Sequence, residues 1–224
     1  GAPICPWWLY ERLPGPLQLW ADRRKHVTAL FAVEGGVTDT HLARWSKLRK
    51  LQRLHMPRAD ITDAGLQHLS GLTDLATLDL QSAPITDAGL VHLSNLQHLD
   101  RLCLTGTQVH GPGLAHLRGL PVLAKVQFAD TPLDDAGLAE VGELKHLDWV
   151  FLNNTQITDA GLVHLRKLPR PELVDLTATG ITDAGLMYLS GLPHLFQVRL
   201  ADTHVTDAGV AEFQRLNPRC DVAR

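Results

Sequence analysis

Apolar residues follow a strict 24-residue period along most of this chain. Counted from Val37, they occupy offsets 0, 5, 8, 11, 14, 17 and 19 of each unit, and the units begin at residues 37, 61, 85, 109, 133, 157, 181 and 205 without insertion or deletion. Offsets 5, 8 and 11 are three apart, as on one face of a short helix, whereas offsets 17 and 19 are two apart, as on one face of a strand. Each unit is therefore predicted to contain a short helix, a loop, a short strand and a turn.

Polar residues at the start of each unit predict where its helix begins. Thr62 supplies a hydroxyl that can cap free amides, and Asp63 places an acid in the positive first turn. One unit cannot bury its own apolar edge, so the units are predicted to stack with parallel strands about 4.8 Å apart. Seven aspartates share offset 2 and are interpreted as first-turn charges: Asp39, Asp63, Asp87, Asp135, Asp159, Asp183 and Asp207.

The pattern LxxLxLxxTxITDAGLxxLxxL, read at residues 147–168 with a few conservative changes, resembles a leucine-rich repeat. Its TDAGL helix start is similar to the ribonuclease-inhibitor-like class and to the 24-residue repeats of many bacterial proteins. The resemblance covers residues 37–216. It implies an α/β solenoid, a curved right-handed stack with a parallel β-sheet on the concave face and short helices on the convex face. It also implies a binding scaffold or module, without naming a ligand.

Threonine stands where this family usually has asparagine after the strand. Stacked hydroxyls are predicted to bond to the loop backbone in place of stacked amides. Ala59 and Ala83 interrupt this column, so their turns are expected to be looser or satisfied differently. The threonines are Thr107, Thr131, Thr155, Thr179 and Thr203.

One continuous domain is predicted, with a capping segment at residues 1–36, eight repeats at 37–216 and a tail or cap at 217–224. The first segment is expected to hold a helix near residues 17–24 and a first strand near 27–33. The tail either caps the last repeat or leads into further chain. Aromatic residues near the start are interpreted as a cover for the open end of the stack, with a partner or membrane-surface anchor as the alternative: Trp7, Trp8, Tyr10, Trp20, Phe31 and Trp45.

Composition narrows the class of protein further. The chain has 224 residues, 41 of them leucine, and a net charge of -3, which excludes a disordered chain, a collagen and a strongly basic nucleic-acid binder. No apolar run reaches the roughly 18 residues of a membrane span. Three cysteines without a CxxC spacing favour a reducing, cytoplasmic compartment slightly. The chain starts without Met, so a removed targeting segment is compatible with it and the compartment stays open.

Charge is divided unevenly along the chain. Residues 1–58 carry a net charge of +6 and the remainder carries -9. Without interleaved aromatics or a reading motif, a solvated basic edge is favoured over a nucleic-acid surface. The alternative function is a structural segment that assembles through its oppositely charged parts. The densest basic stretch has no acid and comprises Arg44, Lys47, Arg49, Lys50, Arg53 and Arg58.

Histidines recur at fixed offsets, yet they do not predict a metal site. Helices of adjacent repeats should lie roughly 10 Å apart, whereas zinc ligands lie about 2 Å from one centre. No nucleophile–base constellation or phosphate-binding loop is present in the sequence, so neither a cofactor nor a small-molecule substrate is predicted and the chain is not expected to be an enzyme. The repeated histidines are His68, His92, His116 and His164 at offset 7, and His98, His146 and His194 at offset 13.

Residues that point away from the core on each strand are the best record of a ligand. Offsets 16, 18 and 20 are predicted to face the concave surface. Leu173 is the single leucine, of 36 from residue 37 onward, that falls outside the core columns. The predicted binding patch has three apolar anchors, Trp149, Phe151 and Leu173, and three polar contacts, Arg101, Lys125 and Arg199.

These residues predict a monomeric, non-enzymatic module that binds a protein or peptide with an acidic or polar rim. The alternative is that the loop containing Pro169 and Pro171, or a contact with another copy, covers the patch. The sequence names neither the partner nor the biological process.

Overall fold

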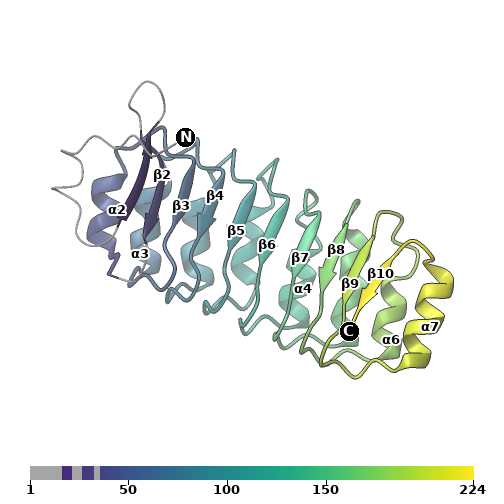
Figure 1. The fold of residues 1–224 in the computed structure, drawn as a ribbon. Helices are drawn as coiled ribbons and strands as arrows, with labels where there is room; N and C mark the ends of the chain where they lie inside the picture. Colours follow the sequence, from purple (N-terminus) through teal and green to yellow (C-terminus); the bar gives the residue numbers. More distant parts are fainter. Residues whose placement is uncertain (1–16, 22–26, 33–35) are drawn as a thin grey trace.

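Ten strands form one open sheet in chain order in the computed structural model, which describes residues 17–21, 27–32 and 36–224 (Figure 1). Strand β1 pairs antiparallel with β2, and β2 to β10 pair parallel with their neighbours. The strands are β1 (Leu17–Ala21), β2 (Val27–Ala32), β3 (Arg53–His55), β4 (Thr77–Asp79), β5 (Arg101–Cys103), β6 (Lys125–Gln127), β7 (Trp149–Phe151), β8 (Leu173–Asp175), β9 (Gln197–Arg199) and β10 (Asp221–Ala223).

Short helices cover one side of this sheet along its length (Figure 1). Most begin at offset 2 of a repeat, directly after the predicted capping residue. They are α2 (Asp39–Trp45), α3 (Asp63–Leu66), η1 (Gln67–Leu69), η2 (Asp87–Leu93), η3 (Pro112–Leu117), α4 (Asp135–Val141), α5 (Asp159–Leu162), η4 (Val163–Lys167), α6 (Asp183–Leu186), η5 (Met187–Leu189) and α7 (Asp207–Leu216). The η elements are 3-10 helices, which suit turns too short for a full α-helix.

The leucine columns form a single elongated core between sheet and helices. Leu54, Leu78 and Leu102 occupy the same offset in successive repeats, pair in register across β3, β4 and β5, and are at most 1% exposed. Because each repeat buries its leucines against those of its neighbours, the core is continuous along the stack. The predicted α/β solenoid is therefore confirmed.

The aspartates at offset 2 join neighbouring repeats as well as lying in first helical turns. Asp159 Oδ1 accepts a bond of 2.8 Å from the Thr182 backbone N–H, and Asp159 Oδ2 accepts one of 2.6 Å from the Thr182 hydroxyl. A Cβ on Gly185 would overlap the same carboxylate, so glycine lets the repeats approach this closely. The same pair of bonds joins Asp39 to Thr62, Asp63 to Thr86, Asp135 to Thr158 and Asp183 to Thr206.

This aspartate–threonine ladder is interrupted in the repeat that begins at residue 109. Asp87 of the preceding repeat still accepts bonds from the backbone amides of His110, Gly111 and Gly113. Gly111 itself replaces the aspartate, and its φ of 135° is open mainly to glycine. A Cβ there would overlap the Cα of Gly137 in the next repeat. Backbone contact therefore takes the place of the aspartate–threonine bonds at this junction.

The predicted threonine column is confirmed as a series of hydroxyl bonds to the loop backbone, buried at every threonine except the partly exposed Thr203. Thr155 Oγ1 donates to the Leu152 carbonyl at 2.6 Å. Ala83, which stands in this column in place of threonine, has no hydroxyl. Its backbone N–H still donates to the Leu80 carbonyl, three residues earlier, at 3.0 Å. Thr107, Thr131, Thr179 and Thr203 make the same hydroxyl bond to the carbonyl three residues earlier.

The two ends of the stack differ in how well the sequence anticipates them. The helix expected near residues 17–24 is wrong, because residues 17–21 form strand β1. Its sequence, LQLWA, alternates with the period of a strand, and its antiparallel pairing covers the edge of β2. At the other end β10 extends the sheet and Val222 packs against the core. No helix in the described part of the chain is long and apolar enough to cross a membrane.

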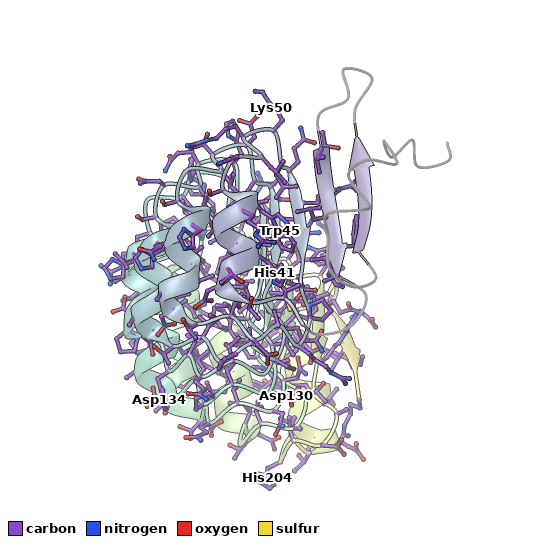
Figure 2. All side chains as sticks on the ribbon, turned by 90° about the vertical axis from the view of Figure 1, so that its left-hand side faces the viewer. His41, Trp45, Lys50, Asp130, Asp134 and His204 are labelled. Carbon is purple, nitrogen blue, oxygen red and sulfur yellow. The ribbon has the colours of Figure 1, made fainter. Side chains whose placement is uncertain are left out.

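Of the aromatic residues expected to cover the open end, Phe31 lies partly exposed on β2 with its ring centroid 6.0 Å from that of His55, whereas Trp45 is buried. It belongs to α2, is 3% exposed and points from that helix toward the sheet (Figure 2). Trp7, Trp8 and Tyr10 lie outside the described residues, so the choice between a cover and an anchor stays a prediction for them.

Candidate functional site

A groove lies over strands β3 to β7 on the face of the sheet opposite the helices, which is the predicted concave face. Its volume is about 280 Å³. Because the strands are parallel and in register, side chains at offsets 16 and 18 form two rows that cross the groove. The residues from these rows that line it are His55, Thr77, Asp79, Arg101, Cys103, Lys125, Gln127, Trp149 and Phe151.

Four of the six predicted binding residues meet in this groove. Arg101, Lys125 and Trp149 are successive register partners on β5, β6 and β7, and Phe151 lies two residues beyond Trp149 on the same strand. The groove therefore has a basic part over β5 and β6 and an aromatic part over β7.

Trp149 is held by contacts on two sides. The Lys125 Nζ lies 3.3 Å from the centroid of the indole ring, within the range of a cation–π interaction. On the other side, the Trp149 Nε1 donates to Glu172 Oε2 at 3.2 Å. The Phe151 ring meets the indole edge to face, with centroids 6.3 Å apart and planes at 65°. The aromatic surface is thus oriented before any ligand binds.

Some charged residues of the groove form ion pairs within the protein, whereas others have, among the described residues, no close partner of opposite charge or only a solvent-exposed one. The Asp79 side chain is largely buried and pairs with His55 at 2.5 Å between Oδ2 and Nδ1. Arg101 pairs with Asp100 at 3.1 Å, but both side chains are at least 41% exposed, so water screens this pair strongly. Lys125 makes no ion pair within the described part of the chain. The cations over β5 and β6 consequently remain open to an anionic ligand.

Leu173 contradicts the expectation of an exposed anchor, because it is only 3% exposed. Its register partners are Trp149 and Gln197, and the larger indole stands beside it, tied to the adjacent Glu172. Leu173 therefore lies buried beside the indole and presents little surface to a partner. The expectation of Arg199 as a free polar contact also changes. It lies outside the groove and pairs with the buried Asp175 at 3.3 Å.

Sequence reasoning missed two features of this site. It singled out neither the His55–Asp79 pair nor Glu172, which orients the indole of Trp149. His55 and Asp79 share offset 18 in adjacent repeats, so their pairing could have been found by reading each column across strands. Glu172 precedes its strand at offset 15 and carries no comparable signal.

Comparisons with known proteins agree with the fold described above. The sequence model of a family described as a leucine-rich repeat matches residues 71–94, which span the end of one repeat and the start of the next. The chain is a leucine-rich repeat protein. Its structure is similar to internalin C2 of Listeria monocytogenes strain 4b F2365, with 26% identity, a TM-score of 0.60, and coverage of 78% of this chain and 81% of that one.

A second internalin, internalin F from the same bacterial strain, gives 16% identity and a TM-score of 0.42, over 81% of this chain and 69% of that one. No curated protein matches the sequence.

The groove of this leucine-rich repeat protein does not assemble a thiol nucleophile with a base. Burial is the main cause that raises the pKa of Cys103, with Asp79 adding to it. His55 lies two strands away and is engaged by Asp79, which occupies the strand between them. Among the described residues no group of three or more His, Cys, Asp or Glu side chains is arranged to hold a metal ion.

Two residues of the basic stretch at residues 44–58 bind groups of the following repeat. Arg49 donates to the Gly71 carbonyl at 2.7 Å, and Lys50 pairs with Asp74 at 3.0 Å. Lys50 projects from one edge of the stack, whereas His204 lies at the opposite edge (Figure 2). Assembly through oppositely charged parts of the chain stays a prediction.

Proposed function

We propose that this leucine-rich repeat protein is a non-enzymatic interaction module that binds a protein or peptide in the groove over β3 to β7. The observation that carries the proposal is the concentration of aromatic and cationic side chains on one strand face. Arg101, Lys125, Trp149 and Phe151 line a single groove of about 280 Å³. Aromatic residues and arginine are the side chains that most often dominate protein interfaces.

The orientation of Trp149 supports a role as an anchor. Ordering a side chain on binding costs about 0.5 to 1.5 kcal/mol. Lys125 and Glu172 already hold the indole in place, so most of this cost is met before a partner arrives. Trp149 and Phe151 both remain partly exposed and can bury further area. Arg101 and Lys125 would then contact polar or acidic groups of the partner.

The assignment of Trp149 as an anchor is tested by comparing the affinity of a captured partner for Trp149→Ala and for the wild-type chain. The partner is first isolated on the wild-type chain, and its dissociation constant is then measured by calorimetry. Removing a central aromatic anchor should reduce the binding free energy by about 2 kcal/mol, which corresponds to a roughly 30-fold weaker complex. Phe196→Ala is the matched control, because Phe196 is 45% exposed and does not line the groove.

Circular dichroism establishes that both variants are folded. An unchanged affinity for Trp149→Ala, or an equal loss for Phe196→Ala, would show that the groove is not the binding site.

A further inference from the structure

Two cations stand side by side in the middle of the groove. Arg101 and Lys125 are register partners on adjacent strands, which places their backbones about 4.8 Å apart. Arg101 keeps only a solvent-screened pair with Asp100, and the Lys125 ammonium rests on the ring of Trp149. A single carboxylate placed between them could contact both, and charge-assisted bonds of this kind are stronger than neutral ones.

We infer that the occupant of the groove is an extended acidic peptide segment, an inference that rests on the function proposed above. In this segment an Asp or Glu contacts Arg101 and Lys125, and a large apolar residue two positions away contacts Trp149 and Phe151. The segment runs across the strands, along the axis of the stack.

Spacing in the groove is the first argument for this pattern. The point midway between Arg101 and Lys125 lies one and a half strand intervals from Trp149, or about 7.2 Å for strands about 4.8 Å apart. In an extended peptide, side chains two residues apart point the same way and are separated by about 6.4 to 6.8 Å. An acidic residue and an apolar residue separated by one intervening residue therefore match the basic and aromatic parts of the groove.

Charge in and around the groove is the second argument. The one carboxylate that lines it, Asp79, is largely buried and paired with His55, so its repulsion of an incoming carboxylate is reduced. Asp100 borders the β5 side, where it pairs with Arg101, and two further acidic groups border the β7 side. There Glu172 accepts the Trp149 N–H, and burial together with Glu172 raises the pKa of Asp148. An acidic residue is thus favoured over β5 and β6 and disfavoured beyond β7, which sets the part of the groove that the acidic residue occupies.

Synthetic peptides test this inference on the complete chain. The probe is a fluorescein-labelled peptide, Gly-Gly-Glu-Ser-Phe-Gly-Gly, acetylated or amidated at the unlabelled end, and its binding is followed by fluorescence anisotropy. Three comparison peptides replace Glu with Gln, replace Glu with Lys, or place Glu directly before Phe. We expect each to bind about tenfold more weakly than the probe, because each loses the carboxylate contact or its spacing.

A charge reversal in the protein provides the complementary test. Lys125→Glu should weaken the probe at least tenfold and reverse the preference, so that the Lys-containing peptide binds better than the Glu-containing one. Lys47→Glu is the matched control, because Lys47 is exposed and lies outside the groove, and it should leave both affinities within about twofold of wild type.

The outcomes separate this inference from the function on which it rests. Equal binding of the Glu, Gln and Lys peptides, or no binding of the probe up to millimolar concentration, would overturn the acidic segment. The interaction module would still stand if a captured partner depended on Trp149. A partner that ignores Trp149→Ala would overturn the proposed function itself, whatever the peptides do.

Discussion

Replacing Asp159 with alanine tests whether the aspartate column joins neighbouring repeats or only adds charge to helix starts. In the structure its carboxylate accepts two bonds from Thr182, of 2.8 Å from the backbone N–H and 2.6 Å from the hydroxyl. A bond to a charged group contributes about 1.5 to 3 kcal/mol at most sites. Here the carboxylate is partly exposed and water competes for it, so about 1 kcal/mol for each bond is appropriate.

Asp159→Ala should therefore lower the free energy of unfolding by about 2 kcal/mol. For a chain of this size, that corresponds to a fall of about 4 to 8 °C in melting temperature. Urea unfolding followed by circular dichroism measures the first quantity and a thermal scan measures the second. A double-mutant cycle with Thr182→Ala should recover a coupling energy of about 1 kcal/mol for the hydroxyl bond.

Asp207 provides the matched control for this experiment. It occupies the same position at the start of α7, but no threonine among the described residues donates to its carboxylate, and its side chain is 96% exposed and pairs with Arg224. If the column joins repeats, Asp207→Ala should cost only a small fraction of the loss seen for Asp159→Ala. Equal losses at the two positions, or a coupling energy near zero, would refute the ladder and leave only the helix-start charge.

Three further outcomes follow from local geometry. Ala178 has a φ of 56°, a left-handed conformation that glycine adopts more readily, so Ala178→Gly should raise the free energy of unfolding by about 0.5 to 1 kcal/mol in urea titrations. Gly111→Ala should lower it by roughly 2 kcal/mol or more, since the new Cβ would overlap the Cα of Gly137. Hydrogen bonds from Lys167 and Lys145 lower the pKa of Glu143 from 4.5 to about 2, so Glu143→Gln should destabilise the protein at pH 7 but not at pH 2.

The sign of the last effect follows from linkage. A depressed carboxylate pKa stabilises the folded state above pH 4.5, and this stabilisation is lost as the pH falls from 4.5 toward 2. A constant difference between Glu143→Gln and wild type from pH 7 to pH 2 would contradict it. For Gly111→Ala and Ala178→Gly, a change of opposite sign in the urea midpoint would contradict the geometry.

Much of the fold could be predicted because one rule recurs in every repeat. Period-3 and period-2 spacings within each unit predicted the helices and strands, and the invariant 24-residue interval predicted their parallel register. The errors occur where this rule stops. Residues 17–21 precede the first full repeat, and their strand depends on antiparallel pairing with β2, a tertiary contact that no column of the repeat encodes.

Prediction of the site was less complete, because exposure depends on side-chain direction as well as on strand face. The alternation rule placed Leu173 on the correct face of β8 but could not show that it is only 3% exposed beside the indole of Trp149. Arg199 was placed correctly as well, yet its partner Asp175 lies one strand away and 24 residues earlier. Identifying such pairs requires each column to be read across strands, where charge and size combine.

The ladder is interrupted beneath the groove, and this links stability to binding. Gly111 belongs to the repeat that carries Lys125, and Gly137 belongs to the repeat that carries Trp149, so these two repeats lack the aspartate–threonine bonds at their helix side. On the strand side they are joined by β6–β7 pairing and by the contact between the Lys125 ammonium and the indole. A ligand that bridges β6 and β7 would reinforce a junction that lacks the aspartate–threonine bonds. Binding in the groove should therefore raise the melting temperature, and a Gly111→Ala chain with unchanged affinity for the ligand should gain the same free energy of unfolding as the wild-type chain.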